Sequence, residues 1–288
     1  MFAGVVSTGA ERILVMPDHS GLARPASNDV EGQIKIDYVE MAVADHQGAS
    51  TNAARAMAEQ GADCIVTLGG DGTNRVVAKG CGEVPLVPIS TGTNNVFPAN
   101  TEGTLAGIAA GAVATGVLTK EEACRRSKRI DIYVDGKRQD DALVDAAVST
   151  QMFVGARAVW DTKTLHSMFL TRAEPASIGL SSIGSRIMPI AIDDEHGLYI
   201  RLSGKPGPNH TTVRAPIAPG MVSDVEIFDW KLFKAGDKID IDLQPGTIAL
   251  DGEREVELLP NQKVYATMST DGPWVVDVPT TMNLLATR

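Results

Sequence analysis

The chain has little of what would tie it to an oxidising compartment or to a structural metal. Its three cysteines, Cys64, Cys81 and Cys124, show neither the even count of a disulfide framework nor a Cys-x-x-Cys spacing. The five histidines are scattered, with no pair at the spacing of a zinc-binding helix. We therefore expect a cytoplasmic protein without a zinc site.

Long apolar runs and a basic charge balance are also missing. The longest apolar run, residues 106–118, is shorter than the roughly 18 residues that a membrane-spanning helix needs. The first residues lack the basic and apolar regions of a signal peptide. A net charge of −10 repels nucleic acid and anionic membranes, so we expect neither as a partner. Any phosphate must be held by local geometry.

The sequence contains two different patterns of apolar residues along its 288 residues. Over residues 1–120, apolar runs alternate with helical patterns, which indicates βαβ units and a parallel sheet. Over residues 121–288 the apolar period falls to two between Asp-Gly and Pro-Gly turns, as is typical of antiparallel strands. We predict an α/β domain and then an all-β sandwich domain, whose C-terminal segment is a candidate to return to the first domain.

Individual elements follow from the same patterns. In the first domain they predict strands and helices that we place as follows: strands at 12–17, 36–43, 64–68 and 85–89, and helices at 50–61 and 104–115. The polar, basic stretch 119–129 is the expected linker. In the second domain we expect one helical insertion, near 161–187.

The stretch IVTLGGDGTNRVV, residues 65–77, is the most informative motif. Asp-Gly pairs usually mark hairpin turns, but Gly69–Thr73 follows a buried-looking strand and precedes a helical pattern. A glycine-rich turn into a helix N-terminus presents backbone N–H groups to an anion. Neither a Walker loop nor a Rossmann fingerprint is present. The turn is a phosphate site or, alternatively, a structural turn.

A second motif, STGTNNVF at residues 90–97, follows the next predicted strand. Neighbouring strand ends meet at one edge of a parallel sheet, where ligands of open α/β sheets bind. Thr91, Thr93, Asn94 and Asn95 can hydrogen-bond phosphate, ribose or a base without adding charge. The alternative is a loop that only caps the next helix.

These two motifs together resemble the superfamily of NAD kinases, diacylglycerol kinases and sphingosine kinases. The likeness is strongest to an ATP-NAD-kinase-like branch associated with acetoin catabolism. It implies an N-terminal α/β domain, a C-terminal β-sandwich, and a nucleotide bound between them. It also implies a homo-oligomer, ATP with Mg²⁺ bridged by the phosphates, and NAD as an alternative ligand or substrate.

The resemblance assigns roles to particular residues. Asp71 takes the place of the general base or substrate-orienting carboxylate, and the segment from Asp251 to Glu253 matches the Asp-Gly-Glu of the lipid kinases. Glu253 is therefore a second candidate base. Val96 stands where lipid kinases have a metal-organising Asp, and residues 143–149 hold no Asn-Glu pair of the NAD-kinase type.

These residues suit phosphoryl transfer, in which charge on the γ-phosphate is neutralised and a hydroxyl is held in line. The expected catalytic residues are Asp71 and Glu253. Most of the expected nucleotide-binding residues are glycines or have a neutral polar side chain, and Arg75 is the candidate basic residue. The full set is Gly69, Gly70, Gly72, Thr73, Asn74, Arg75, Thr91, Gly92, Thr93, Asn94, Asn95 and Asp251.

The sequence thus predicts an ATP-dependent kinase that phosphorylates a hydroxyl of a small metabolite, with acetoin catabolism suggested by the resemblance. Two alternatives stay open. One is a nucleotide- or NAD-binding sensor that has lost turnover, and the other is an NAD kinase proper.

Overall fold

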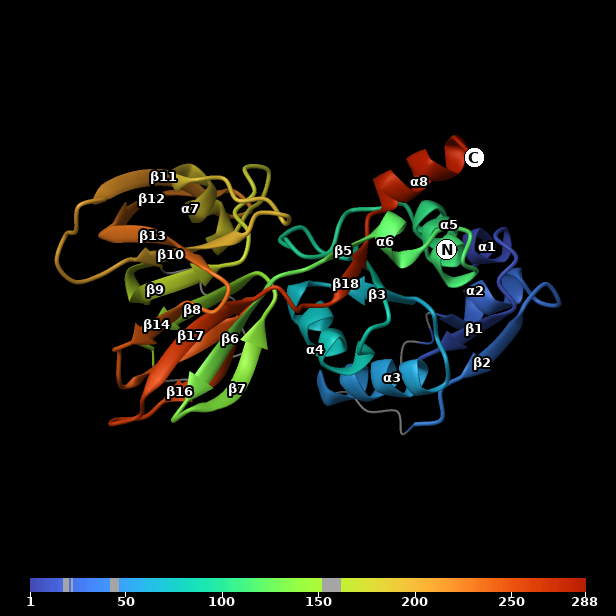
Figure 1. The fold of residues 1–288 in the computed structure, drawn as a ribbon, viewed down its shortest axis with the longest axis horizontal. Coiled ribbons are helices and arrows are strands. Elements are labelled where there is room, and N and C mark those ends of the chain that lie inside the picture. Colours follow the sequence, from blue (N-terminus) through green and yellow to red (C-terminus); the bar gives the residue numbers. More distant parts are fainter. Residues whose placement is uncertain (18–20, 22, 42–46, 152–161) are drawn as a thin grey trace. The chain divides into compact units, whose positions relative to one another are not determined.

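The computed structural model describes residues 1–17, 21, 23–41, 47–151 and 162–288 (Figure 1). This part of the chain divides into two compact units. The first contains residues 1–91, 98–126 and 273–288, and the second contains residues 92–97 and 127–272. Across the described ranges, no helix has the length and apolar character to cross a membrane.

The first unit is an α/β layer built on a mainly parallel sheet, which confirms the predicted fold class. The strands β3 (Ile65–Gly69) and β4 (Leu86–Ser90) are parallel neighbours. The C-terminal strand β18 (Trp274–Val276) lies between β4 and the antiparallel β5 (Cys124–Arg126). The helices of this layer are α3 (Gln47–Glu59), α4 (Asp71–Cys81), α5 (Gly103–Ala114), α6 (Lys120–Ala123) and α8 (Val278–Ala286).

Two of the predicted strands form a separate ribbon. The strands β1 (Arg12–Val15) and β2 (Lys35–Tyr38) pair in parallel with each other, and in the described residues neither pairs with β3. The short helices α1 (Phe2–Val6) and α2 (Ala23–Asp29) accompany this ribbon. The parallel sheet of the first unit is therefore divided into two pieces.

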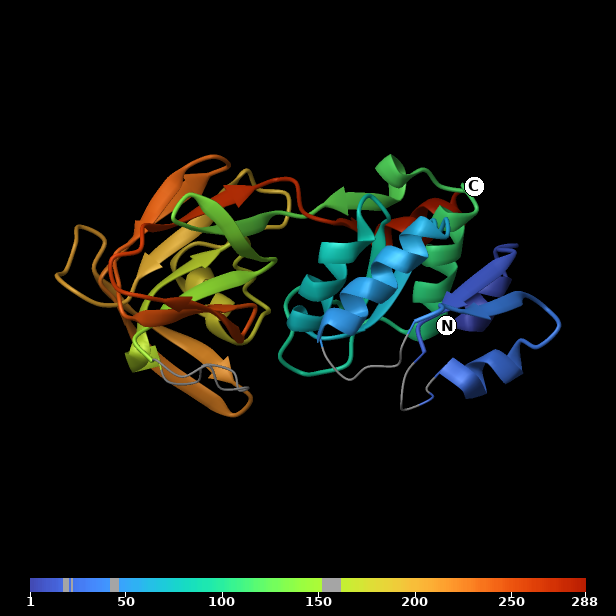
Figure 2. The same ribbon diagram turned by 90° about the horizontal axis from the view of Figure 1, so that it is seen from below.

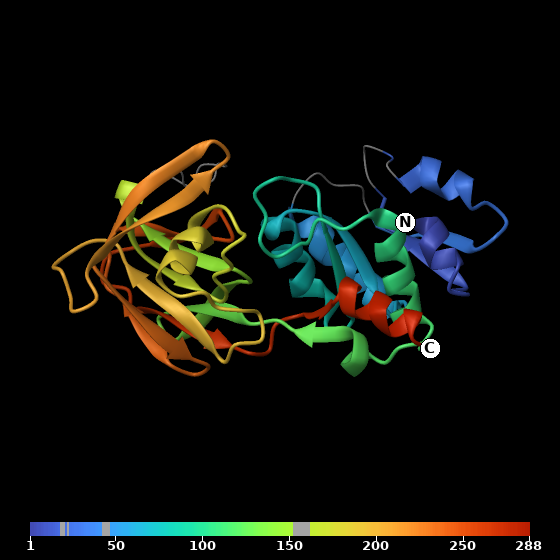
Figure 3. The ribbon, with the colours of Figure 1, turned by 90° about the horizontal axis from the view of Figure 1, so that it is seen from above.

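Glycines allow the helices of the first unit to approach closely. A Cβ on Gly80 of α4 would lie 2.1 Å from the Thr51 carbonyl oxygen of α3. A Cβ on Gly107 of α5 would lie 2.1 Å from the Met1 carbonyl oxygen. Figure 2 shows α3 and α4 side by side, and Figure 3 shows α8 against α5. Larger residues at these glycines would force the helices apart.

The second unit is built from antiparallel sheets, as predicted. Six strands run in the order β13-β10-β9-β8-β15-β16, four in the order β14-β17-β6-β7, and β11 pairs with β12. One buried cluster contains Ile132 of the four-stranded sheet together with Phe169 and Ile248 of the six-stranded sheet. The two sheets therefore share a hydrophobic core, as in a β-sandwich.

Strand bounds in the second unit complete the inventory. They are β6 (Arg129–Val134), β7 (Lys137–Ala142), β8 (Asp145–Ser149), β9 (Leu165–Leu170), β10 (His196–Arg201), β11 (Thr211–Ala218), β12 (Met221–Ile227), β13 (Asp229–Lys234), β14 (Lys238–Ile241), β15 (Gly246–Leu250), β16 (Glu253–Leu258) and β17 (Val264–Ser269).

The structure corrects one local expectation. The segment expected to be one helical insertion contains the strand β9, and its only α-helix in the described residues is α7 (Leu180–Ile187). The side chains of β9 are almost all buried, so an apolar run in a sandwich core had been taken for a helix. The expected linker, residues 119–129, contains α6 and β5, and the chain passes from the first unit to the second within it, between residues 126 and 127.

Candidate functional site

The glycine-rich turn joins a strand directly to a helix, as predicted. β3 ends at Gly69, Gly70 is the N-cap in an extended conformation, and α4 begins at Asp71. The first hydrogen bond of this helix runs from the Asn74 amide to the Gly70 carbonyl oxygen, at 3.1 Å. The amides of the first helical turn have no acceptor within the helix, which makes this terminus suited to an anion.

Gly69 is required by close packing inside the turn. A Cβ at this position would lie 2.6 Å from both the Cβ and the Oγ1 of Thr73. Thr73 is half-buried, so its side chain has little room to move away. The turn and the first helical turn therefore form one rigid piece.

Asn74 braces this piece from within. It is fully buried, its Oδ1 accepts a hydrogen bond of 2.5 Å from the Thr67 hydroxyl, and its Nδ2 donates to the Gly70 carbonyl oxygen at 2.8 Å. Thr67 lies on β3 and was not identified from the sequence. Both polar atoms of the Asn74 amide are thus engaged by the turn itself, which favours a bracing role over contact with a nucleotide.

Asp71 and Arg75 lie one helical turn apart at the start of α4. Asp71 is the first helical residue and is half-buried, a position at which the helix dipole stabilises a negative charge. Arg75 is only 1% exposed, so it is a buried arginine and not a solvated side chain. Its guanidinium is held within the protein.

The end of β4 lies beside the glycine turn, which confirms that the two strand ends are neighbours. Gly69 is opposite Ser90 in the parallel register, and the Thr91 amide donates to the Gly69 carbonyl oxygen at 3.4 Å. Thr91 is exposed at this edge. The carboxyl ends of two adjacent parallel strands are the usual position of ligands in open α/β sheets.

The residues that follow, 92–97, group with the second unit. Phe97 is buried beneath the guanidinium of Arg172, whose Cζ lies 5.3 Å from the ring centre. The Oδ1 atom of Asn94 is buried and has no hydrogen-bond partner among the described residues. Gly92 and Thr93 are exposed, and the amide of Asn95 lies against Gly92.

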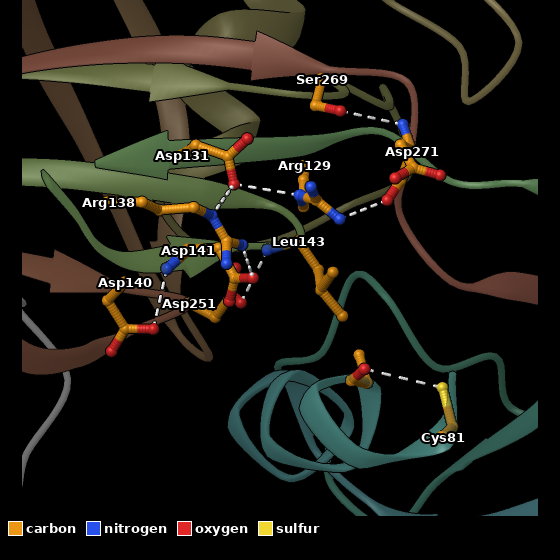
Figure 4. A network of polar contacts seen from close by, with 11 residues as sticks. Cys81, Arg129, Asp131, Arg138, Asp140, Asp141, Leu143, Asp251, Ser269 and Asp271 are labelled. Carbon is orange, nitrogen blue, oxygen red and sulfur yellow. Dashed lines mark hydrogen bonds and ion pairs between the residues drawn. The ribbon is translucent and has the colours of Figure 1, made fainter. Parts of the chain in front are cut away.

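Asp251 binds backbone amides of the second unit (Figure 4). It stands with Gly252 in the turn between β15 and β16, with φ angles of 51° and 82°. Its carboxylate accepts hydrogen bonds from three successive amides at 2.9, 2.7 and 3.1 Å, those of Leu143, Val144 and Asp145. This arrangement favours a structural role for Asp251.

Glu253 is the first residue of β16 and is half-buried. Its position at the end of a strand keeps it as a candidate base.

Lys128 lies in the basic stretch 119–129 and is only 3% exposed. Its ammonium donates to the carbonyl oxygens of Ala191, Asp194 and His196 at 3.1, 2.7 and 2.9 Å. Burial lowers the pKa of Lys128 to about 8, with a further lowering by Arg172 that the carboxylates of Asp194 and Asp193 oppose. Lys128 therefore fixes the segment before β10.

The acidic and sulfur side chains give no metal site of their own. Among the described residues, no group of three or more His, Cys, Asp or Glu side chains is arranged to hold a metal ion. Burial raises the pKa of the Cys81 and Cys124 thiols to about 11, so neither is poised as a nucleophile. The glycine-rich turn and the N-terminus of α4 are the features suited to an anion.

Comparison with known proteins agrees with this arrangement. The ATP-NAD kinase N-terminal domain matches residues 10–116, and the acetoin catabolism protein X C-terminal domain matches residues 128–271. A crystal structure of yeast NADH kinase complexed with NADH is similar over 99% of this chain and 82% of that chain, with a TM-score of 0.51 and 12% identity. The fold is therefore NAD kinase-like.

Similarity to one curated protein identifies the family of the whole chain. Acetoin catabolism protein X of Cupriavidus necator is 39% identical over 294 residues, which cover 98% of this chain and 81% of the relative. The chain belongs to the acetoin catabolism protein X family.

Proposed function

We propose that the protein is an ATP-dependent kinase that transfers a phosphoryl group to a hydroxyl of a small metabolite. The observation that carries this proposal is the glycine turn from Gly69 to Thr73, which leads a buried strand into the N-terminus of α4 beside the end of β4. The family match to an ATP-NAD kinase domain over residues 10–116 supports a nucleotide as the ligand.

The phosphates fit this turn on structural grounds. Glycines leave the backbone accessible, and the first-turn amides and helix dipole favour negative charge. Asn74 and Thr67 hold the amides in place before the ligand arrives, so little ordering is needed on binding. Thr91, at the end of β4, can donate its hydroxyl at the same edge.

Magnesium fits only as an ion carried by the phosphates, because the described residues offer no acidic cluster for it. When bound, it would neutralise charge on the transferred group. The protein's own contribution is orientation. Asp71 is the proposed group that orients the acceptor hydroxyl and takes its proton, and Glu253 is the second candidate.

A non-catalytic sensor that binds ATP or NAD is the second candidate function. Asp251, which matches the carboxylate of the lipid-kinase segment, gives its oxygens to three backbone amides. A carboxylate used in this way contributes to folding. Its presence therefore does not favour an enzyme over a binding protein. An NAD kinase proper is a further alternative, consistent with the name of the N-terminal family match.

The test is a mass-spectrometric transfer assay. The protein is incubated with Mg²⁺-ATP and a pool of NAD, NADH, acetoin, short diols, polyols and diacylglycerol. We expect one phosphorylated product, which disappears with Asp71→Asn and persists with Asp29→Asn, a matched change at an exposed residue at the end of α2. Tight ATP or NAD binding without any product would favour the sensor.

A further inference from the structure

Arg172 is a buried cation of the second unit that lies against the loop of residues 92–97. It is 4% exposed and follows the end of β9 by two residues. Its Nη2 atom donates a hydrogen bond of 3.2 Å to the buried Ser127 hydroxyl. Its Cζ atom lies 5.3 Å from the centre of the ring of Phe97, which is also buried. A cation is attracted more strongly to an aromatic face when both are removed from water.

The backbone on both sides of Arg172 is fixed by hydrogen bonds. Before it, the Thr171 hydroxyl donates to the Leu143 carbonyl oxygen at 2.7 Å. After it, Ala173 exchanges two backbone hydrogen bonds with Ile190, at 2.9 and 3.0 Å. The guanidinium of Arg172 is therefore carried by backbone that is held at both ends.

The backbone that holds Thr171 is in turn held by Asp251. The amides of Leu143 and Val144 donate to the Asp251 carboxylate at 2.9 and 2.7 Å, and the Leu143 carbonyl oxygen accepts from Thr171. A continuous series of hydrogen bonds thus leads from Asp251 to the residue before Arg172. Buried hydrogen-bond networks of this kind make a structure rigid.

The loop of residues 92–97 contains groups that need such support. Gly92 and Thr93 at its start are exposed, whereas Phe97 at its end is buried. The Oδ1 atom of Asn94 is buried without a hydrogen-bond partner among the described residues. An unsatisfied buried acceptor destabilises the conformation that carries it. The conformation of the loop therefore depends on its other contacts, and the Phe97 ring provides one of them.

We infer that Arg172 is a positioning residue: its guanidinium holds Phe97, and with it the loop of residues 92–97, in the conformation that binds the nucleotide. The inference rests on the proposed function, because it takes a nucleotide as the ligand. A loop that is ordered before binding loses less conformational entropy when the ligand arrives. A ribose hydroxyl or a base amine of the nucleotide can also donate to the Asn94 Oδ1 atom.

Amide hydrogen exchange without ligand tests the positioning itself. In Arg172→Met and in Phe97→Leu, the amides of residues 93–97 should exchange at least about tenfold faster than in the wild type, because the loop opens more often. The Leu143 amide, which is bound by Asp251, should keep its protection. Arg186→Met changes an exposed arginine of α7 and is the matched control, in which the loop should exchange as in the wild type.

Titration with Mg²⁺-ATP and initial rates test the consequence for binding. Arg172→Met should raise both Kd and KM for ATP by at least about tenfold and leave kcat at saturating ATP within about threefold, as expected when only binding is lost. Arg172→Lys keeps a cation near the Phe97 ring and should recover part of the affinity. The double variant Arg172→Met/Phe97→Leu should bind ATP no more weakly than the weaker single variant, since both changes remove the same contact.

Three results would overturn the inference. The first is normal loop exchange in Arg172→Met and Phe97→Leu, and the second is faster exchange with unchanged affinity for ATP. The third is an additive loss of affinity in the double variant, which would mean that the ring and the guanidinium act separately. If Arg172→Met does not fold, as judged by its urea denaturation curve, Phe97→Leu and Arg172→Lys decide the same questions.

Failure of the proposed kinase gives a different result. A wild type that binds ATP without forming product would exclude the kinase, and the Kd values of the variants would still decide the role of Arg172. A wild type that binds no nucleotide would overturn both proposals.

Discussion

Two Asp-Gly turns, one in each unit, use the same dipeptide for different purposes. Asp71 and Gly72 begin a helix, where the Asp is half-buried at the positive end of the helix dipole. Asp251 and Gly252 form a left-handed hairpin turn, where the Asp is 7% exposed and holds three backbone amides. The second turn completes the fold, whereas the first is the one that we propose to bind a ligand, although their sequences look alike.

The largest effect should come from changing the first aspartate. Asp71→Asn should lower phosphoryl transfer by at least about 100-fold, because proton transfer by a positioned side chain contributes this much or more. The free energy of unfolding should change by less than about 0.5 kcal/mol, since a helix-terminal Asn is well tolerated. Initial rates and urea denaturation measure the two quantities. Normal turnover in this variant would exclude Asp71 as the base.

The corresponding change in the second turn should act on stability. Asp251→Ala should lower the free energy of unfolding by about 3 kcal/mol, because three amides in a buried position lose a charged acceptor. Asp251→Asn keeps one acceptor oxygen and should cost less. Urea midpoints of both variants check the order. An unchanged midpoint for the Ala variant would show that water replaces the carboxylate.

Substitution of the glycine in each turn should change stability by less than the Asp251 substitution does. Gly252 has a φ of 82°, so Gly252→Ala should lower the free energy of unfolding by about 1 kcal/mol. Gly72 lies within α4, so Gly72→Ala should leave stability unchanged or raise it slightly while weakening nucleotide binding. Thermal denaturation and ATP titration distinguish them. Equal losses of stability would mean that the two turns are alike.

The last comparison concerns the pH dependence of stability and the buried charge of Lys128. Lys128 donates to three carbonyl oxygens where Asp251 accepts from three amides. Its pKa of about 8 in the folded protein lies below the ordinary 10.5, so between these values the unfolded chain holds a proton that the folded chain has released. This contribution therefore makes the free energy of unfolding rise with pH across that window.

The check is a comparison with a variant that cannot titrate. Urea midpoints of the wild type and Lys128→Met are measured at pH 7.5 and 9.5, and the wild type should gain stability relative to the variant at the higher pH. A difference that shrinks as the pH rises would show that the ammonium is more stable in the folded protein than in the unfolded chain.

The fold class and the neighbouring strand ends could be predicted because their causes are local. A strand, a glycine turn and a helix follow one another from Ile65 to Cys81, and consecutive strands usually pair. Helix and strand could not be distinguished for residues 165–170, because the buried run has no alternation to reveal its period.

The roles of individual polar residues were harder to predict because their partners are distant in the chain. Asp251 binds amides 106 to 108 residues away, and Lys128 binds carbonyl groups 63 to 68 residues away. The sequence predicts that the Asn74 amide binds a nucleotide, whereas in the structure it accepts a hydrogen bond from Thr67 on the preceding strand. The roles of Asp71 and Glu253 remain predictions for the transfer assay.

The position of β18 has a consequence for synthesis of the protein. Residues 274–276 form an inner strand of the first unit, between β4 and β5, and α8 follows them to the end of the chain. On the ribosome, the strands that make up the second unit are therefore complete before the first unit receives its last strand. Nascent chains lacking the final residues would expose an edge of β4, a natural point for chaperones or proteases to act.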